Sequence, residues 1–218
     1  DSYSTDNTTT IALRNPKVKV IQNKFDNYTN QRNLALENAS NNWVLFLDAD
    51  ERITPKLKSE IITELNKSQT KDAYFFKRKF YFHKSPIHFS GTQTDKNFRL
   101  FKKDKAHYAP YKLVHETLIV NGSIGTLKNF LIHYSCDGYE IYKGKMIRYG
   151  ELKGKELFQK NKKYSLIKQL SKTFFKFFKT YILHLGILDG INGITLCYLQ
   201  TLSVWQTYST LKQLEKSK

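Results

Sequence analysis

The sequence predicts an α/β protein with a mixed sheet and a C-terminal helical extension. Three observations support this fold class. Short apolar runs alternate with helical patterns before Ala73, aromatic-rich runs linked by Gly, Pro and Asn turns follow it, and the pattern is helical from Gly138 onward. Strands that alternate with helices are typical of α/β domains, whereas turn-linked strands suit a mixed or antiparallel part of a sheet.

The first half contains two short apolar runs and two helical patterns. Residues 18–21 and 43–47 indicate strands, and residues 28–39 carry apolar side chains at helical spacing. Thr54 is suited to cap a second helix, with Pro55 at its first position. Strands and helices of these lengths predict βαβ units around a parallel sheet.

The second half predicts four further strands and then helices. The strands are expected at Ala73–Phe82 and at residues 97–102, 113–120 and 131–135. The helices follow from Gly138, with breaks expected at Gly186, Gly190 and Gly193. The change of pattern divides the chain into a first domain at residues 1–137 and a basic amphipathic helical extension at residues 138–218.

The chain opens on a polar segment, residues 1–8, that looks like the end of a strand followed by a helix cap. An α/β domain rarely begins with such a turn. We therefore expect a strand and a helix to precede Asp1 in the complete domain, so that the first domain is truncated at its N-terminus and lacks its first strand.

The net charge of +17 at pH 7 predicts an acidic partner, whether nucleic acid, anionic lipid or a phosphorylated substrate. Between Gly138 and Leu183, twelve Lys and Arg residues stand against three Glu residues. There Lys172, Lys176 and Lys179 share one helical face and Phe residues fill the rest, which suits a membrane interface with anionic lipid. Alternatively, the Phe side chains pack on the first domain and the lysines are simply solvated.

Two features bear on location. Cys136 and Cys197 are far apart and show no metal-ligand spacing, which favours a reducing compartment without disulfides or a zinc site. The most apolar stretch, residues 181–205, is interrupted by polar residues such as His184 and Asp189. Because charge inside a membrane is costly, we expect a buried or surface-lying helix pair there and no transmembrane helix.

Two carboxylates follow the apolar run at residues 43–47. In open α/β sheets, ligands bind at the carboxyl ends of strands, and side chains two apart in an extended segment point the same way. Asp48 and Asp50 are therefore candidates to hold one divalent ion, since Mg²⁺ and Mn²⁺ prefer oxygen ligands and commonly take one or two carboxylates plus phosphates. The alternative is a solvated turn in which Asp50 or Glu51 only favours the next helix.

The polar loop at residues 1–8 has two interpretations as well. Its Asp, Ser and Thr side chains offer donors and acceptors to a base or a ribose. Alternatively, Asp6, Asn7 or Thr8 simply caps the following helix.

The order of the motifs narrows these alternatives. The polar loop comes first, then Asn30-Gln-Arg-Asn33 at the start of a helix, then the apolar strand that ends in Asp48-Ala-Asp-Glu-Arg52. This order resembles the inverting family 2 glycosyltransferases of the GT-A fold, particularly the branch that builds lipopolysaccharide core, whose motif is Asp-Ala-Asp-Glu-Arg. The family's first strand, with an Asn-Glu after it, has no counterpart here. The resemblance continues through Phe98-Arg-Leu-Phe101, Val114-His-Glu116, Ile132-His-Tyr-Ser135, residues 145–149 and Leu188-Asp-Gly190.

The resemblance implies a GT-A nucleotide-diphospho-sugar transferase fold, which is a Rossmann-like mixed sheet, with residues 1–137 as its catalytic domain. It implies that Asp6 hydrogen-bonds the nucleobase and that Arg32 lies beside the base or the diphosphate. Asp48 would contact the ribose or the metal shell, and Asp50 would ligate the Mn²⁺ or Mg²⁺ that bridges the phosphates. From the residues alone, Arg32 could equally be a solvated residue on a helix surface.

Inversion at the anomeric carbon requires a base for the acceptor hydroxyl. Glu116 is the candidate base, and His115 is the candidate residue that orients it or contacts the acceptor. The alternative is a surface ion pair between Glu116 and one of the many lysines. His133 is expected to be structural, with a place in the metal shell as the alternative.

We therefore expect metal-dependent, inverting transfer of a sugar from a nucleotide sugar, a UDP-sugar, to a membrane-associated glycan or glycolipid acceptor in cell-envelope polysaccharide or lipopolysaccharide core synthesis. The expected location is cytoplasmic, peripheral on the inner face of the bacterial cytoplasmic membrane. No nucleic acid is expected as a partner, because no RNP-type or Arg-Gly-rich motif occurs. The alternatives are a non-catalytic basic protein that binds nucleic acid or membrane, and an inactive relative of the transferases.

Overall fold

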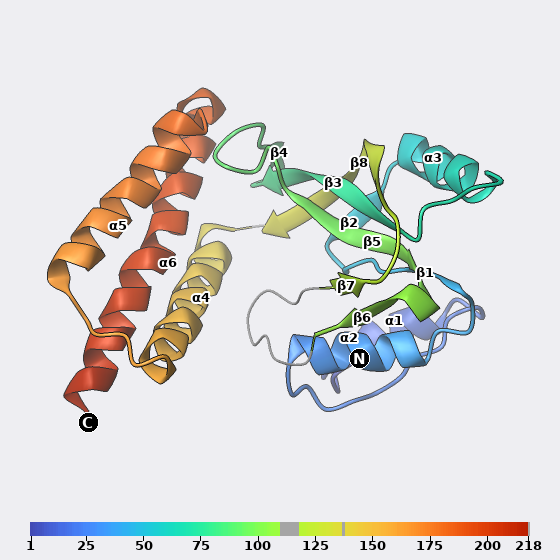
Figure 1. Ribbon diagram of the computed structural model, residues 1–218, viewed down its shortest axis with the longest axis horizontal. Coiled ribbons are helices and arrows are strands. Elements are labelled where there is room, and N and C mark those ends of the chain that lie inside the picture. The colour runs from blue at the N-terminus through green and yellow to red at the C-terminus, as the bar shows by residue number, and fades with distance from the viewer. Residues whose placement is uncertain (110–117, 137, 218) are drawn as a thin grey trace.

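A computed structural model describes residues 1–109, 118–136 and 138–217. A sheet with its covering helices forms one half of the molecule, and three long helices form a layer beside it (Figure 1). The first half of the chain runs in the order α1 (Thr8–Leu13), α2 (Tyr28–Glu37), β1 (Trp43–Leu45), β2 (Glu51–Ile53), α3 (Pro55–Leu65), β3 (Ala73–Phe82), β4 (Ser85–Pro86) and β5 (Lys96–Lys102). There follow η1 (Lys103–Lys105), β6 (Ala106–Tyr108), β7 (Leu118–Val120), β8 (Ile124–Cys136), α4 (Tyr139–Gln159), α5 (Leu166–Phe178), η2 (Lys179–Leu183), η3 (Gly186–Asp189) and α6 (Gly190–Lys216).

The main sheet is mixed, as predicted. Its strand order is β1-β5-β3-β8-β2, with β4 paired to β3, and a separate ribbon joins β6 to β7. Among the described strands, β3 and β8 form the parallel pair and the other neighbours are antiparallel. The expected βαβ units of the first half are therefore wrong. Residues 18–21 form no strand, and β1 runs antiparallel to β5.

Helix α3 forms as its sequence predicts. The Thr54 side chain accepts a hydrogen bond from the backbone N–H of Leu57 at 3.2 Å, and Pro55 occupies the first turn, where a missing N–H costs nothing. Leu57 and Ile61, four residues apart, are the buried face of this helix. They pack with Tyr74 of β3 and Leu131 of β8, so this helix covers one face of the sheet.

The opposite face of the sheet is covered by α2 and the β6–β7 ribbon. Leu36 of α2 and Tyr108 of β6 pack with Ala73 and Phe101. Ala73 and Tyr74 are neighbours in β3 but belong to the two different core clusters, as the alternation of side chains along a strand requires. The sheet is thus held between two apolar layers.

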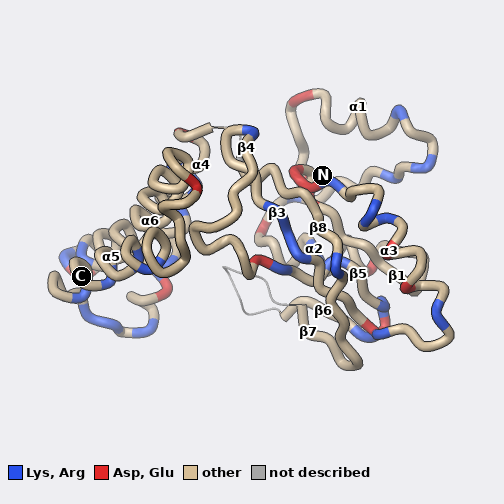
Figure 2. Tube along the Cα trace, turned by 90° about the horizontal axis from the view of Figure 1, so that it is seen from above, with Lys and Arg blue, Asp and Glu red and all other residues tan. Residues whose placement is uncertain are grey.

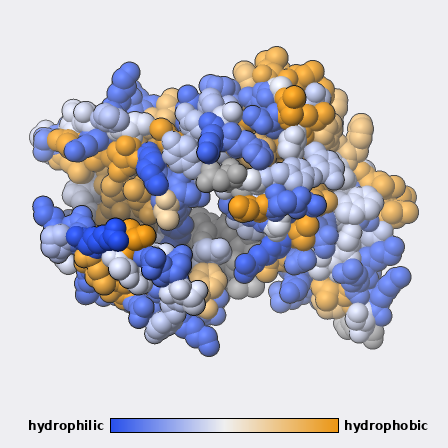
Figure 3. All heavy atoms as spheres, turned by 180° about the vertical axis from the view of Figure 1, so that it is seen from behind, coloured by the Kyte–Doolittle hydropathy of each residue, from blue (hydrophilic) through white to orange (hydrophobic). Residues whose placement is uncertain are grey.

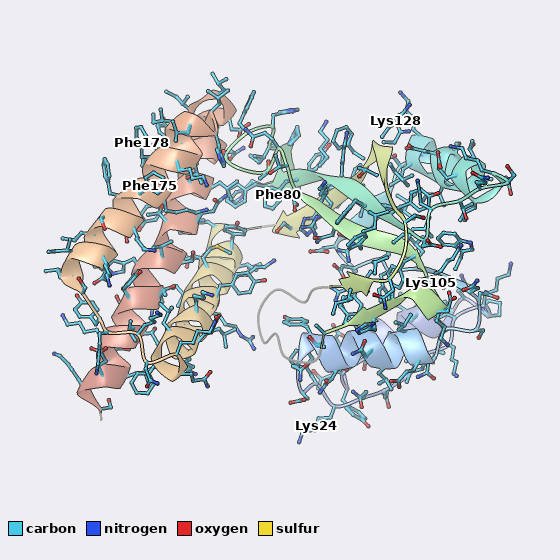
Figure 4. The ribbon with its side chains drawn as sticks, in the orientation of Figure 1. Lys24, Phe80, Lys105, Lys128, Phe175 and Phe178 are labelled. Carbon is cyan, nitrogen blue, oxygen red and sulfur yellow. The ribbon has the colours of Figure 1, made fainter. Side chains whose placement is uncertain are left out.

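A third apolar cluster joins the sheet to the helical layer. Phe80 and Phe82, at the end of β3, pack with Tyr142 and Met146 of α4 and with Leu199 of α6. Phe80 lies between the sheet and the helical layer in Figure 4. This contact positions α4 against the edge of the sheet where the candidate carboxylates lie.

The helical layer depends on glycine at the contact between α4 and α6. A Cβ atom on Gly150 would lie 2.6 Å from the carbonyl oxygen of Ser203, and one on Gly154 would lie 2.7 Å from that of Thr207. Distances this short are not tolerated, so the two helices approach as closely as they do only because α4 carries no side chain there. By contrast, a Cβ atom on Gly144 of the same helix meets nothing within 4 Å.

This difference predicts opposite effects of one substitution at two positions of α4. Gly150→Ala should lower the free energy of unfolding by about 1–3 kcal/mol, because the new methyl group overpacks a fixed backbone. Gly144→Ala should raise it by up to about 1 kcal/mol, because alanine is the better helix former. Urea unfolding followed by circular dichroism measures both, and a stabilising Gly150→Ala would show that α4 and α6 do not pack this closely.

The expected helix breaks are partly confirmed. Gly186 opens η3, and Gly190 begins α6 with a φ of +61°, which favours glycine. Gly193 is instead inside α6, where a Cβ would clash with the carbonyl oxygen of Gly186. In the described part of the chain, no single helix combines the length and hydropathy needed to cross a membrane. Leu166–Leu183 and Gly186–Lys216 meet that test only as a pair, bent by 69°, and by length and composition alone.

Candidate active site

A pocket of about 650 Å³ lies between the sheet and α4. It receives side chains from α2, the β1–β2 turn, strands β3, β5 and β8, and α4. Seen from behind, the surface is hollowed between the sheet half and the helical layer (Figure 3). Arg32, Asp48 and Asp50 all line this pocket. Three of the residues singled out in the sequence therefore meet in one place.

Asp48 and Asp50 lie on a tight turn and not on an extended segment. The backbone N–H of Glu51 donates to the carbonyl oxygen of Asp48 at 2.9 Å, and the N–H of Asp48 donates to the Glu51 carboxylate at 3.1 Å. The sequence predicted that the two carboxylates point the same way because they lie on an extended segment, and that reason is wrong. They still line the same pocket, because the turn presents both toward it.

The carboxylate of Asp48 is held by two guanidinium groups. Arg32 of α2 lies 3.2 Å from it, and Arg99 of β5 forms a shorter bond. Arg32 also lies over the rings of Phe46 and Tyr108, with its central carbon 5.9 Å and 5.7 Å from their centroids. Arg32 is therefore a fixed member of the pocket, which argues against a freely solvated helix-surface residue.

Glu51 is the buried anchor of this arrangement. Its side chain is 0% exposed and lies 2.6 Å from Arg99, which is 2% exposed, and 3.4 Å from Arg78. Arg78 in turn binds Asp95 through two nitrogens, at 2.8 Å and 3.0 Å. A buried carboxylate is tolerated only when it is paired and hydrogen-bonded. The network therefore holds the Asp48–Glu51 turn in position.

Asp50 is the carboxylate that the arginines leave available. It is 41% exposed, and Nε2 of His133 lies 3.3 Å from it. The hydrogen bond from His133 and the positive charge of Lys145 hold the pKa of Asp50 below its ordinary value. The backbone supports this position, since the N–H of Tyr134 donates to the Asp50 carbonyl oxygen at 2.8 Å. Asp50 therefore presents an ionised carboxylate to the pocket.

The Asp50 carboxylate fits a divalent ion that arrives with its substrate. Among the residues that the structure describes, no three His, Cys, Asp or Glu side chains form a metal-binding group. Mg²⁺ and Mn²⁺ need no such group when waters and substrate phosphates complete the shell around one or two carboxylates. Nδ1 of His133 is buried and, within the described ranges, has no hydrogen-bond partner. Because metal-bound histidines usually donate from the second nitrogen, His133 is better suited to orient Asp50 than to bind metal.

Asp6, the remaining described residue of the predicted site, does not line this pocket. It is exposed and accepts a hydrogen bond from the N–H of Thr8 at 2.9 Å. This bond is local, spanning two residues, and Asn7 at the N-cap of α1 makes no side-chain capping hydrogen bond. His115 and Glu116 lie outside the described residues.

The sequence did not indicate the two residues that hold the Asp48–Glu51 turn in place, Arg99 and Glu51. Arg99 lay within a motif that had no assigned role, and Glu51 was considered only as a helix-favouring residue. One signal was available, because a charged residue between Phe98 and Leu100 in an apolar strand must be paired if it is buried. Its partner, 48 residues earlier in the chain, could be identified only in the folded structure.

The fold and this pocket define a class of protein: an α/β enzyme with an anionic turn and several cations placed to receive a charged, nucleotide-like substrate. The family model of Glycosyl transferase family 2 matches residues 1–119, and the chain belongs to this family. The protein is a glycosyltransferase, and its mixed sheet with C-terminal helices is consistent with the predicted GT-A fold.

Similar proteins agree with this membership. Uncharacterized glycosyltransferases of Rickettsia typhi and Rickettsia conorii are each 28% identical to the chain over 208 residues; the matches cover 88% of this chain and 69% and 72% of theirs. The lipopolysaccharide core biosynthesis glycosyltransferase LpsC of Rhizobium meliloti is 21% identical over 221 residues, which is 96% of this chain and 82% of that protein. The predicted resemblance to this family and branch is confirmed.

Proposed function

We propose that this glycosyltransferase catalyses metal-dependent, inverting transfer of a sugar from a UDP-sugar to a membrane-associated glycan acceptor, in the synthesis of cell-envelope polysaccharide or lipopolysaccharide core. The observation that carries the proposal is the exposed, ionised Asp50 carboxylate beside the Asp48–Arg99–Glu51 network in one pocket. The name of the Rhizobium meliloti relative, a lipopolysaccharide core biosynthesis glycosyltransferase, supports the choice of acceptor.

In this proposal Asp50 holds Mn²⁺ or Mg²⁺, with His133 as the residue that orients it. The bound ion would act as a Lewis acid that neutralises charge on the departing nucleoside diphosphate. Arg32 and Lys145 face the same pocket and supply positive charge for the phosphates. Asp48, which is held between two arginines, would accept a hydrogen bond from the ribose. Glu116 remains the proposed base, with His115 beside it in sequence.

We also propose that the protein works in the cytoplasm, at the inner face of the bacterial cytoplasmic membrane. Among the charged positions of the helical layer, Lys and Arg are more common than Asp and Glu (Figure 2). A lipid-linked acceptor would require the enzyme at such a surface, and an anionic membrane would attract this layer.

Binding of UDP tests the proposed donor site. Isothermal titration of the whole chain with UDP should give a dissociation constant that improves strongly when Mn²⁺ is present, since the ion joins Asp50 to the diphosphate. Binding that is indifferent to metal and is displaced by RNA would instead support the non-catalytic nucleic-acid-binding alternative. Release of UDP from a panel of UDP-sugars then distinguishes an active transferase from an inactive relative.

Lys145 provides a second test of the same site. Lys145→Gln should weaken UDP binding by about 10–100-fold, the loss expected when a charged hydrogen-bond donor to a phosphate is removed. Lys143→Gln is the matched control, because Lys143 lies on the same helix and pairs with Glu140 at 3.5 Å outside the pocket. Equal losses in both variants would mean that α4 contributes only general positive charge.

A further inference from the structure

A second pocket, of about 610 Å³, lies on the helical layer and shares no lining residue with the active-site pocket. It is formed by α5, η2 and α6 together with the chain around Gly91, between β4 and β5. Lys172, Lys176, Lys179 and His184 line it. The proposed glycosyl transfer uses none of these residues.

The three lysines concentrate positive charge along one side of the pocket. They recur at helical spacing on α5 and η2, so they share one face. In the part of the chain that the structure covers, no ion pair involves any of them. Lys176 is partly buried, and desolvation followed by repulsion from Lys179 lowers the pKa of its ammonium group. Uncompensated charge of this kind stabilises a bound anion.

The wall of the pocket around Gly91 is fixed by Asp189, which belongs to the motif Leu188-Asp-Gly190. Its carboxylate accepts hydrogen bonds from the backbone N–H groups of His88 and Phe89, at 2.9 Å and 3.0 Å, and from the Ser90 hydroxyl at 2.7 Å. The acidic group of η3 is therefore engaged by the loop and does not neutralise the lysines. The motif acts here as a clamp that holds one side of the pocket.

His184 adds a polar atom to this wall. Its carbonyl oxygen accepts from the N–H of Ser90 at 3.1 Å and from the Gln93 amide at 2.8 Å, which fixes the residue against the loop. Its ring atom Nδ1 is buried and has no hydrogen-bond partner among residues 1–109, 118–136 and 138–217. This atom lies against the loop, because a Cβ atom on Gly91 would come within 3.0 Å of it.

The surroundings of the pocket are apolar and open to solvent. Phe174 and Phe175 of α5 are 71% and 57% exposed, and Ile191 at the start of α6 is 84% exposed. Phe175 and Phe178 project from α5 in Figure 4. Apolar side chains also gather at the end of the helical layer where α5 leads into α6, at the upper right of Figure 3. A contiguous apolar surface beside lysines is typical of a face that contacts a membrane.

We propose that the pocket between α5 and α6 binds the phosphate group of an anionic membrane lipid, while the neighbouring Phe and Ile side chains enter the acyl region. The lysines match the charge of the phosphate, and the exposed apolar residues match the lipid chains. A nucleic acid would pair with the lysines but would leave the exposed apolar residues in water. The observations therefore favour a lipid. The inference rests on the proposed membrane location and extends it to one defined site.

Sedimentation with lipid vesicles tests this site. Vesicles of phosphatidylcholine and phosphatidylglycerol in equal parts should bind the whole chain, and pure phosphatidylcholine should bind it weakly. The triple variant Lys172→Gln, Lys176→Gln, Lys179→Gln should lower partitioning onto the anionic vesicles by about 100-fold, the combined effect of three lysines at an anionic surface. The control triple Lys155→Gln, Lys162→Gln, Lys163→Gln removes the same charge from exposed positions outside the pocket and should lower it by less than about fivefold.

Equal losses in the two triple variants would overturn the proposal, because binding would then depend on diffuse charge. Titration with glycerol 3-phosphate tests a soluble source of the phosphate. Tight binding that only the pocket triple abolishes, without effect on vesicles, would assign the pocket to a soluble ligand and also overturn it. Displacement of the chain from vesicles by stoichiometric RNA would also overturn the proposal, because the pocket would then favour nucleic acid. Phe174→Ser should independently weaken vesicle binding, since it removes an exposed apolar group.

The experiments can reject the lipid site and the proposed transferase activity independently. The pocket triple should retain wild-type, Mn²⁺-dependent UDP binding, because its residues are absent from the active-site pocket. Normal vesicle binding without Mn²⁺-dependent UDP binding in the wild type would reject the proposed function alone. Normal UDP binding without vesicle binding would reject the lipid site alone.

Discussion

Replacing Asp50 by Asn should lower sugar transfer by about 1000-fold, the size of loss seen when charge stabilisation at a reacting centre is removed. Among the described residues no arginine pairs with Asp50, which lines the pocket at 41% exposure, while both oxygens of Asp48 are engaged by arginines. The substitution removes the negative oxygen that a divalent ion needs, with almost no change in size. Mn²⁺-dependent UDP binding, followed by calorimetry, should therefore be lost together with UDP release from the UDP-sugar.

A control separates this effect from a general change in charge. Asp104→Asn removes an exposed carboxylate from η1, away from the pocket, and should leave both measurements unchanged. The pKa of Asp50 is held below its ordinary value, mainly by the hydrogen bond from His133, so Asp50 stays ionised near neutral pH. If Asp50→Asn kept its Mn²⁺ dependence and its rate, the metal site would have to lie elsewhere.

Replacing Arg99 by Met should destabilise the protein by about 3–5 kcal/mol, because it leaves the Glu51 carboxylate buried without its main partner. Glu51 is 0% exposed, and the distance between Arg99 and Glu51 is 2.6 Å. The free energy of unfolding of a native protein is only about 5–15 kcal/mol, so this one substitution should remove a large part of it. Urea unfolding, measured by circular dichroism and extrapolated to water, reports the difference.

A double variant and an exposed pair distinguish burial from charge alone. Arg99→Met combined with Glu51→Gln should recover part of the lost stability, since the unpaired charge is removed with its partner. Lys160→Met breaks the pair with Glu156 at 2.6 Å, where Lys160 is 61% exposed, and should cost less than about 1 kcal/mol. A cost for Arg99→Met as small as that of Lys160→Met would contradict the buried network.

Local features of the sequence were enough to predict several elements. The bounds of β3 agree with the predicted strand at Ala73–Phe82, and α3 begins with the predicted Thr54 cap and Pro55. These elements follow from a side-chain hydrogen bond within one turn and from a run rich in aromatic residues, and both signals act over a few residues. The strand expected at residues 18–21 did not form, because a short β-branched run needs a partner strand and none pairs with it among the described residues.

Strand direction could not be predicted in the same way. An apolar run such as Trp43–Leu45 is compatible with parallel or antiparallel neighbours, and its pairing with β5 depends on residues more than 50 positions later in the chain.

The sequence by itself determined the family, the carboxylates at Asp48 and Asp50, and the basic character of the last helices, because each depends on short motifs and on their order along the chain. The tertiary structure alone decided what each carboxylate does. It brings Arg99 to Asp48 and Glu51, His133 to Asp50, and the loop around Ser90 to Asp189. These contacts join residues dozens of positions apart, and the burial of a charge makes its partner obligatory without indicating where in the chain that partner lies.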